Sequence, residues 1–219
     1  PPAPPVPHDT DVLRRLPHVR QSHAWDCGLA CVEMVLRLYG AGRGCSVDTL
    51  AAAVGTRSTW TIDLAYLLNS FGVPLSLSTV TLGVNDSYRA LEFYNDDLGD
   101  DARRVKALFT KAPSVGVSVV QVRVCGSDLS AGAAVFVVLV DLRYLRCNLC
   151  FMKRPLLCFT YTGHFIVVCG YDKATDTFVY RDPASRKPHC VINAADLEVA
   201  RKAYGTDEDV LRIPVQKTL

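Results

Sequence analysis

The segment that most constrains the fold runs from residue 21 to residue 40, QSHAWDCGLACVEMVLRLYG. From Gly28 to Tyr39 almost every residue is apolar, and only Glu33 and Arg37 interrupt the run. Because those two lie four positions apart, they share one stripe of a helix and can pair there. The rest of the helix surface is apolar and must be buried. A chain of 219 residues, 49% of them hydrophobic, can supply such a core within one domain.

The balance of charged residues argues against two classes of partner. The chain carries 24 basic and 22 acidic residues, for a net charge of +2, and both signs are mixed along the sequence. This balance gives no long-range attraction toward nucleic acid or anionic membrane, so we expect neither as a partner. The longest apolar runs, residues 133–140 and 165–171, are far shorter than the ~20 residues of a membrane-spanning helix and are typical of buried strands.

The start of the chain and the cysteines indicate where the protein works. Residues 1–17 begin PPAPPVPHDTD, without the apolar core of a signal peptide. We interpret them as a flexible proline-rich leader ahead of a single domain at residues 18–219. Nine cysteines is an odd number, and their spacing does not resemble a small secreted disulfide scaffold. We therefore expect reduced cysteines and a cytoplasmic protein.

The order of hydrophobic periods predicts an α+β fold, in which N-terminal helices pack on a mostly antiparallel sheet. Helical spacing dominates the early chain, whereas alternation and short apolar runs dominate the later chain. Beyond the first helix, we expect helices at residues 46–54, 59–71, 100–112 and 194–204, and a helical turn within 127–133. Strands are expected at residues 75–80, 117–124, 134–141, 164–171, 177–181 and 210–215.

Cys27 lies at the mouth of the first helix, and this position suits a nucleophile. The unpaired N–H groups of a helix start carry partial positive charge, which stabilises a thiolate and lowers its pKa. Cys31, one turn further along, loses that benefit and is interpreted as a core cysteine. A thiolate nucleophile needs an imidazole partner. Of the five histidines, His164 opens an apolar strand directly after a glycine. His8 is in the leader, His18 and His23 are in the approach to the helix, and His189 is in a loop.

The hairpin that begins with His164 selects one acidic residue. The loop between its strands is centred near Lys173, so residue 164 is expected opposite about residue 182, the aspartate of YRDPA. Asp182 can then hold one ring nitrogen of His164 while the other nitrogen faces Cys27. Asp172 lies at the turn and is too far along the strand for this contact.

Gln21, six residues before Cys27, fits the remaining role in acyl transfer. Negative charge develops on the carbonyl oxygen of the substrate during such a reaction. A side-chain amide from Gln21, together with the backbone N–H of Cys27, would stabilise that charge.

These residues resemble the bacteriocin-processing, C39-like cysteine peptidases within the papain-like fold. The shared pattern is a glutamine six residues before an Asp-Cys-Gly, a helix that ends in Tyr-Gly, and a later Gly-His and Asp-Pro. It occurs here as Gln21, Asp26-Cys27-Gly28, Tyr39-Gly40, Gly163-His164 and Asp182-Pro183. The resemblance implies a papain-like fold and a cysteine hydrolase, without a cofactor, that acts on a peptide or protein.

A second resemblance covers roughly residues 18–215. The segments WDCGLAC, WTIDLAYLL, TLGVN, GHFIVVCGYD and YGTDEDVL are similar to the guanylyl cyclase domain-containing proteins, whose plant members are described as soluble guanylyl cyclases. This resemblance implies the alternative that the protein forms cyclic GMP from GTP with magnesium or manganese. A cyclase of the familiar kind needs carboxylates for two metal ions, and Asp63 and the acidic pairs at 96–97 and 100–101 are the candidates. We interpret those pairs more simply as a loop and a helix start.

The cysteine site therefore leads the functional prediction, which is a peptidase or a related acyl-transfer enzyme. Transamidase, deamidase and thioesterase chemistry share the same site logic. A peptide-binding or protein-binding module that keeps the fold without turnover is a further alternative.

The motif CNLC at residues 147–150, with Cys158 nearby, raises the question of a zinc site. A second Cys-x-x-C is absent from the sequence, and the nearest histidine is His164, which is already assigned. We interpret Cys147 and Cys150 as loop cysteines that hold no metal.

Overall fold

The computed structural model describes residues 10–42, 44–94, 98–130, 134–150 and 160–215. The helices are α1 (Thr10–Arg15), α2 (Cys27–Leu38), α3 (Val47–Val54), α4 (Thr61–Ser70), α5 (Leu98–Lys111), α6 (Gly126–Ser130) and α7 (Ala194–Arg201), with 3-10 turns at Asp86–Ala90, Glu92–Tyr94 and Ala112–Val115. The strands are β1 (Ser76–Thr79), β2 (Ser118–Gln121), β3 (Ala134–Asp141), β4 (Gly163–Asp172), β5 (Thr177–Arg181), β6 (Cys190–Asn193) and β7 (Val210–Pro214).

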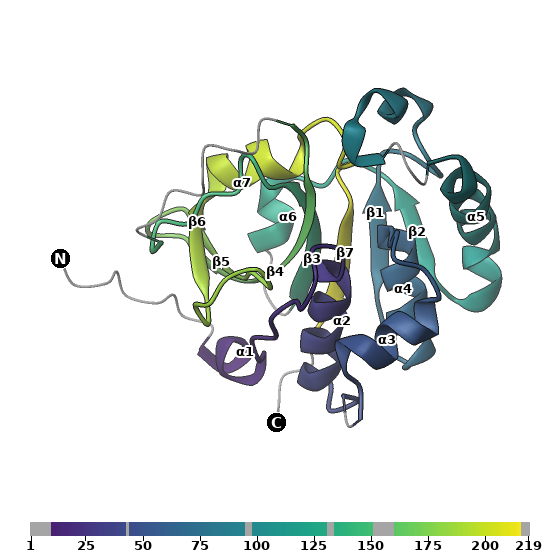
Figure 1. Cartoon of the computed structure of the whole chain (residues 1–219). Helices are drawn as coiled ribbons and strands as arrows, with labels where there is room; N and C mark the ends of the chain where they lie inside the picture. Colours follow the sequence, from purple (N-terminus) through teal and green to yellow (C-terminus); the bar gives the residue numbers. More distant parts are fainter. Residues whose placement is uncertain (1–9, 43, 95–97, 131–133, 151–159, 216–219) are drawn as a thin grey trace.

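The strands form one seven-stranded sheet in the order β2-β1-β7-β3-β4-β5-β6 (Figure 1). Strands β1 and β2 pair in parallel, and the other neighbours pair antiparallel. The last strand, β7, lies between β1 and β3, so it joins the pair β2-β1 to the four strands β3 to β6. The predicted α+β architecture, with early helices on a mostly antiparallel sheet, is confirmed.

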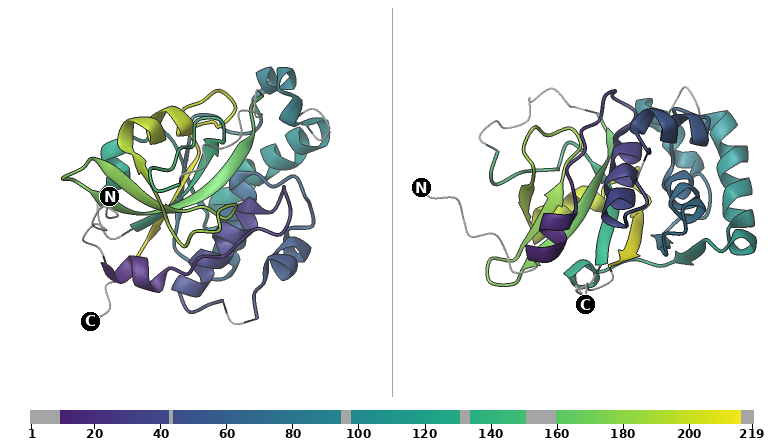
Figure 2. Two further views of the ribbon diagram at one scale, coloured as in Figure 1. Left: turned by 60° about the vertical axis from the view of Figure 1, so that its left-hand side comes forward. Right: turned by 90° about the horizontal axis from the view of Figure 1, so that it is seen from below.

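Helices cover both faces of the sheet, and strand β3 shows how. Its residues Val135, Val137 and Leu139 pack in the core with α1 to α5, whereas Phe136 and Val138 pack in a second core with α6 and α7. Side chains alternate between the two faces of a strand, so a strand buried on both faces is an unbroken apolar run. The two helical layers are visible in the views of Figures 1 and 2.

Helix α2 is the buried central helix that its sequence predicts. Eleven of its residues are buried, and only Arg37 among its twelve reaches solvent freely. The Arg37 guanidinium pairs with the Glu33 carboxylate as expected. Gly28 permits close packing, because a Cβ there would lie 2.9 Å from Leu64 and 3.0 Å from Phe165. The start of α2 therefore sits directly against α4 and β4.

Residues 10–17 depart from the predicted flexible leader. Thr10–Arg15 form helix α1, whose Val12 joins the main core, followed by the buried Leu16. The buried guanidinium of Arg181, on β5, donates hydrogen bonds to the carbonyl oxygens of Leu13 and Leu16. Carbonyls at the end of a helix lack partners within the helix, and here a residue far along the chain supplies the donor.

The short strand β6 was also absent from the prediction.

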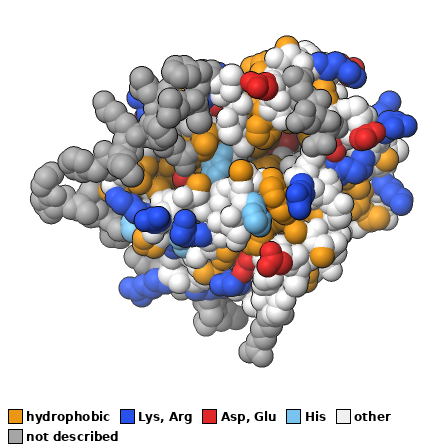
Figure 3. Space-filling model, viewed as in Figure 1, with side chains coloured by type: hydrophobic (Ala, Val, Ile, Leu, Met, Phe, Trp, Pro, Cys, Tyr) orange, Lys and Arg blue, Asp and Glu red, His pale blue; other side chains and the backbone are white. Residues whose placement is uncertain are grey.

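The described part of the chain contains no helix long and apolar enough to cross a membrane. Acidic, basic and hydrophobic side chains are interspersed on the face shown in Figure 3.

Candidate active site

Cys27 is the first residue of α2, and its surroundings favour the thiolate. The carboxylate of Asp26 accepts hydrogen bonds from the backbone N–H groups of Ser22 and His23, at 3.2 and 3.0 Å, which fixes the loop that leads into the helix. Burial raises the pKa of the Cys27 thiol. The hydrogen bond and charge of His164, with the backbone N–H groups of Phe165 and Gly28, outweigh burial, so the pKa of Cys27 is lowered from its ordinary value.

His164, near the start of β4, connects Cys27 to Asp182. Its Nε2 lies 2.8 Å from Asp182 Oδ1, which leaves Nδ1 for the Cys27 thiol. Burial lowers the pKa of His164, but the hydrogen bonds with Asp182 and Cys27 raise it, and the net pKa is about 9. The arrangement is a buried thiol–imidazole–carboxylate chain from α2, β4 and the end of β5.

The predicted contact between His164 and Asp182 is present, but the predicted register is wrong. Val167 pairs with Arg181, so a continued ladder would place residue 184 opposite His164. A bulge between Val168 and Gly170 and a turn between Asp172 and Thr177 shift the register from the simple count. Asp182 still reaches His164 because residues two apart on a strand share a face, and diagonal neighbours lie within reach of long side chains.

The segment after β5 is held against the approach to α2. Asp182 Oδ1 also accepts the Ala184 N–H at 2.9 Å, which orients the carboxylate. His18 Nε2 lies 2.9 Å from the Asp182 carbonyl oxygen, and the Gln21 N–H donates to the Pro183 carbonyl at 3.0 Å. These bonds keep the chain around Asp182 beside the chain that leads to Cys27.

Gln21 lies in this approach segment, and its side-chain amide forms a hydrogen bond with a backbone carbonyl. Gln21 Nε2 donates to the His23 carbonyl at 2.7 Å, and the buried Gln21 Oε1 has no hydrogen-bond partner among the residues that the structure describes. An amide nitrogen has two hydrogens, so one remains available. The role of Gln21 as an oxyanion donor stays a prediction.

Cys31 is a core residue in an environment unlike that of Cys27. It is fully buried, and burial first, then the charges of Cys27 and Asp182, raise its pKa well above the ordinary value. The two cysteines on one helix therefore differ in their thiolate character in the direction that the sequence predicts.

A cavity of about 260 Å³ opens beside Cys27. Aromatic side chains and carboxylates line it, so that it is apolar in part and acidic in part. The lining includes Trp25, Trp60, Tyr94, Phe165, Arg57, Asp101, Asp207 and Asp209.

Asp207 and Asp209 were missed by the sequence prediction, although they form a visible acidic run just before the last strand. Burial first, and then the charge of Asp207, raise the pKa of Asp209 to about 7. Only the placement of β7 in the middle of the sheet brings this run to the cavity of Cys27.

The carboxylates expected to serve a cyclase have structural partners. Asp63 accepts the Trp60 N–H at 2.8 Å at the start of α4 and pairs with the Arg104 guanidinium. Asp101 accepts the Trp60 indole N–H at 2.7 Å and pairs with Arg104 at 2.8 Å. Asp100 is exposed, and the pair at 96–97 lies outside the described residues.

Comparison with known proteins identifies the family. The sequence profile of a family described as guanylylate cyclase matches residues 16–213. The chain belongs to this family. It is similar to the protein named Guanylyl cyclase 1 of Arabidopsis thaliana, with 42% identity over 92% of this chain and 76% of that protein.

A solved structure is also similar, at lower identity. It is that of a C39-like peptidase from Bacillus anthracis, with a TM-score of 0.47, 12% identity, and coverage of 93% of this chain and 96% of that chain. Gln21, Cys27, His164 and Asp182 all lie within the range that the family profile matches.

Proposed function

We propose that this member of the guanylylate cyclase family is a cysteine hydrolase with Cys27 as nucleophile. The observation that carries the proposal is the buried chain from Cys27 through His164 to Asp182. Three separate elements contribute these side chains, and the pKa values of the thiol and the imidazole shift in opposite directions, toward a thiolate and an imidazolium.

In the proposed reaction the Cys27 thiolate attacks the acyl carbon of the substrate, and the carbonyl oxygen becomes negative. The protonated His164 gives its proton to the leaving amine or alcohol as the carbon–heteroatom bond breaks. An acyl thioester on Cys27 remains. Neutral His164 then takes a proton from water, whose oxygen attacks the thioester, and the acid product leaves with the thiol restored as the ion pair. Asp182 holds the ring orientation throughout.

Charge on the tetrahedral oxygen would be stabilised by N–H groups near the start of α2. The proposed donors are the backbone N–H of Cys27 and the free hydrogen of the Gln21 amide. Since the His23 carbonyl holds the other hydrogen of that amide, the donor would be positioned before the substrate binds.

A peptide or protein segment is the proposed substrate class. The cavity beside Cys27 combines aromatic walls from Trp25, Trp60 and Tyr94 with the carboxylates of Asp207 and Asp209. Such a lining suits a side chain with an apolar stem and a cationic end. The reaction as proposed needs no metal or organic cofactor.

The name of the plant relative favours a second candidate, the formation of cyclic GMP from GTP. That reaction would need magnesium or manganese and a cation for the triphosphate. Since Asp63 and Asp101 pair with Arg104, Asp207, Asp209 and Arg57 are the better candidates among the residues that line the cavity.

One experiment distinguishes the cysteine hydrolase from the guanylyl cyclase. The wild-type protein, Cys27→Ala, Asp209→Asn and the buried control Cys31→Ser are assayed in parallel with GTP plus Mg²⁺ or Mn²⁺ and with a peptide and thioester library. We expect acyl turnover in the wild type and in Cys31→Ser, and its near-complete loss in Cys27→Ala, because the acyl-enzyme cannot form. Cyclic GMP production that survives Cys27→Ala and disappears in Asp209→Asn would overturn the hydrolase proposal and support the cyclase.

The binding-module alternative has its own signature. It is supported if the protein turns over neither substrate class and Cys27 reacts with a thiol-directed probe no faster than Cys31. The hydrolase proposal requires faster labelling of Cys27, because its thiolate is favoured and it lines the open cavity.

A further inference from the structure

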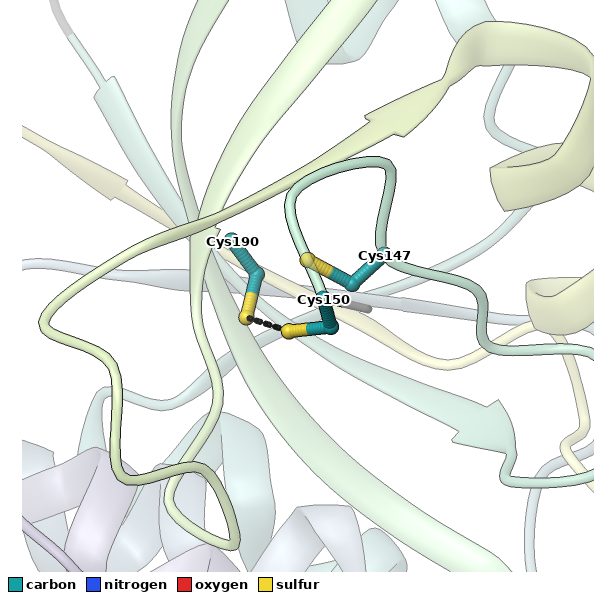
Figure 4. A group of neighbouring side chains, drawn as sticks. All are labelled: Cys147, Cys150 and Cys190. Carbon is teal, nitrogen blue, oxygen red and sulfur yellow. Dashed lines mark hydrogen bonds between the residues drawn. The ribbon is translucent and has the colours of Figure 1, made fainter. Parts of the chain in front are cut away.

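Three cysteine side chains converge away from Cys27, at the edge of the sheet. Cys147 and Cys150 come from the loop after β3, and Cys190 is the first residue of β6. Their sulfur atoms all lie within 4.8 Å of one another, and Cys150 Sγ is 4.0 Å from Cys190 Sγ (Figure 4). The sequence motif supplies two of these residues, and the third joins them only in the fold.

We propose that Cys147, Cys150 and Cys190 bind one zinc ion through their three sulfur atoms. The fourth position of the tetrahedron is taken by water or by another ligand.

The sulfur positions suit this ion. Zinc–sulfur bonds are about 2.3 Å long, so two sulfurs of a tetrahedral site are roughly 3.8 Å apart. The 4.0 Å between Cys150 and Cys190 is close to that separation, and the remaining pairs need to move by no more than about 1 Å from the 4.8 Å limit. Thiolate sulfur selects soft or borderline ions such as Zn²⁺ over Mg²⁺ or Ca²⁺.

The backbone around the sulfurs is already held in place. The Asn148 N–H donates to the Val191 carbonyl at 2.8 Å, and Asn148 Nδ2 donates to Asn193 Oδ1 at 2.8 Å. The Cys150 N–H donates to the Cys147 carbonyl at 3.2 Å, which closes the turn between the two loop cysteines. The loop is thereby fastened to the edge strand β6, and little ordering remains to be done when an ion binds.

Hydrogen-bond donors point at the sulfurs, as around metal-bound thiolates. Backbone N–H groups of Val191 and Leu149 face the Cys147 sulfur. The hydrogen bond from Cys190 is the largest cause that lowers the pKa of Cys147, and Cys150 and these N–H groups lower it further. Burial raises this pKa, and the net value is about 5. The positive charge of Lys187 acts on Cys150, and its Nζ donates to the Leu149 carbonyl.

Zinc binding by this group balances without any oxidation. All three cysteines bind the ion as thiolates, and each sulfur that carries a proton releases it to solvent as it binds. A disulfide between Cys150 and Cys190 would instead require an oxidant and would remove two ligands. Zinc loading and disulfide formation therefore exclude each other and can be told apart.

The test uses the full chain purified without added metal and under reducing conditions. Metal analysis is expected to find about one zinc per chain in the wild type, and replacement by Co²⁺ is expected to produce thiolate-to-cobalt charge-transfer bands with tetrahedral d–d bands. Removal of the metal should lower the melting temperature by at least about 4 °C. Cys150→Ser and Cys190→Ser should lose the zinc, whereas the matched control Cys125→Ser, an exposed cysteine, should keep it.

Cys150→His separates loss of the ion from loss of the fold, because histidine is also a zinc ligand, and it should retain part of the metal. The proposal is overturned if wild-type protein gives cobalt spectra without thiolate bands, or if the Cys150→Ser, Cys190→Ser double variant binds as much zinc as the wild type. Peptide mapping that finds Cys150 and Cys190 joined as a disulfide in a parallel sample, freshly purified without a reductant, would also overturn it.

Discussion

His164 Nε2 lies 2.8 Å from Asp182 Oδ1, and both side chains are buried. A carboxylate at this distance from an imidazole favours the charged ring, and without it burial would favour the neutral ring. The pKa of His164 is nevertheless raised to about 9, in part because the ring also meets the Cys27 thiol. Asp182 thereby keeps His164 able to donate a proton at neutral pH.

Asp182→Asn should lower the turnover of the proposed hydrolase and move its alkaline limit to lower pH. The pKa of His164 falls when a carboxylate that raises it is removed, by about 1–3 units for a close charge, so the imidazolium is lost earlier as pH rises. We expect kcat to drop by about 10²–10⁴-fold. The pH profile of kcat/KM measures the shift, and Asp100→Asn, at an exposed aspartate, serves as control. An unchanged alkaline limit would contradict this assignment of Asp182.

Cys27 should react with iodoacetamide at neutral pH faster than Cys31, but a second cysteine will compete with it. The pKa of Cys147 is lowered to about 5, chiefly by the hydrogen bond from Cys190, so Cys147 is also expected to label in protein from which zinc has been removed. The measurement is therefore made by peptide mapping in a Cys147→Ser background. His164→Ala should slow the labelling of Cys27, because it removes the hydrogen bond and charge that favour the thiolate. Equal rates with and without His164 would count against the ion pair.

Gln21→Ala should reduce kcat by about 10²–10³-fold and leave KM nearly unchanged, as for the loss of one oxyanion donor. The exposed Gln121→Ala on β2 provides the matched control. Steady-state kinetics and a thermal melt are needed together. If the melting temperature of Gln21→Ala falls while kcat is preserved, Gln21 acts only through its bond to the His23 carbonyl.

Asp63→Ala should lower the free energy of unfolding by about 1–3 kcal/mol, because it leaves the Trp60 N–H and the Arg104 guanidinium without a shared carboxylate. Urea denaturation measures the change. Asp48→Ala, an exposed acid in the first turn of α3, is expected to stay within about 0.5 kcal/mol of the wild type. Under the cyclase reading based on Asp63, the main loss would be in GTP turnover instead of stability.

Asp209→Asn should stabilise the fold increasingly as pH rises. The pKa of Asp209 is raised from 3.8 to about 7 by burial and by Asp207, so between these values the unfolded chain is ionised while the folded chain keeps the proton. Stability of the wild type therefore falls as pH rises through this window, and the full cost is present above pH 7. The variant lacks this titration. The melting temperatures of both proteins are measured at pH 4 and pH 8, and we expect the variant to exceed the wild type by more at pH 8. A larger excess at pH 4 would contradict the prediction.

Much of the core and of the proposed triad follows from local sequence patterns. Helix α2 is apolar around nearly its whole circumference, so burial is its only stable environment, and Cys27 must then sit at its N-terminal end. The hairpin of β4 and β5 joins neighbouring segments, so His164 and Asp182 were expected to meet even though the count was off by two. That error was harmless because the side chains of a strand alternate with a period of two residues.

Tertiary structure alone decided the contacts between segments far apart in the chain. Strand β7 inserts between β1 and β3 and thereby brings Asp207 and Asp209 to the cavity of Cys27. The guanidinium of Arg181 fastens α1 to the core through the carbonyls of Leu13 and Leu16.

Cys190 is the clearest example of a residue that only the tertiary structure places in a site. The motif CNLC identifies a pair of cysteines in the sequence, but no residue near the motif indicates a third. Local hydrophobic periods and capping residues determine which segments become helices and strands. Cys190 is placed beside Cys147 and Cys150 by the contact between the loop after β3 and the edge strand β6, where the Asn148 N–H donates to the Val191 carbonyl. Local hydrophobic periods do not encode this contact, because it depends on the packing of the whole sheet.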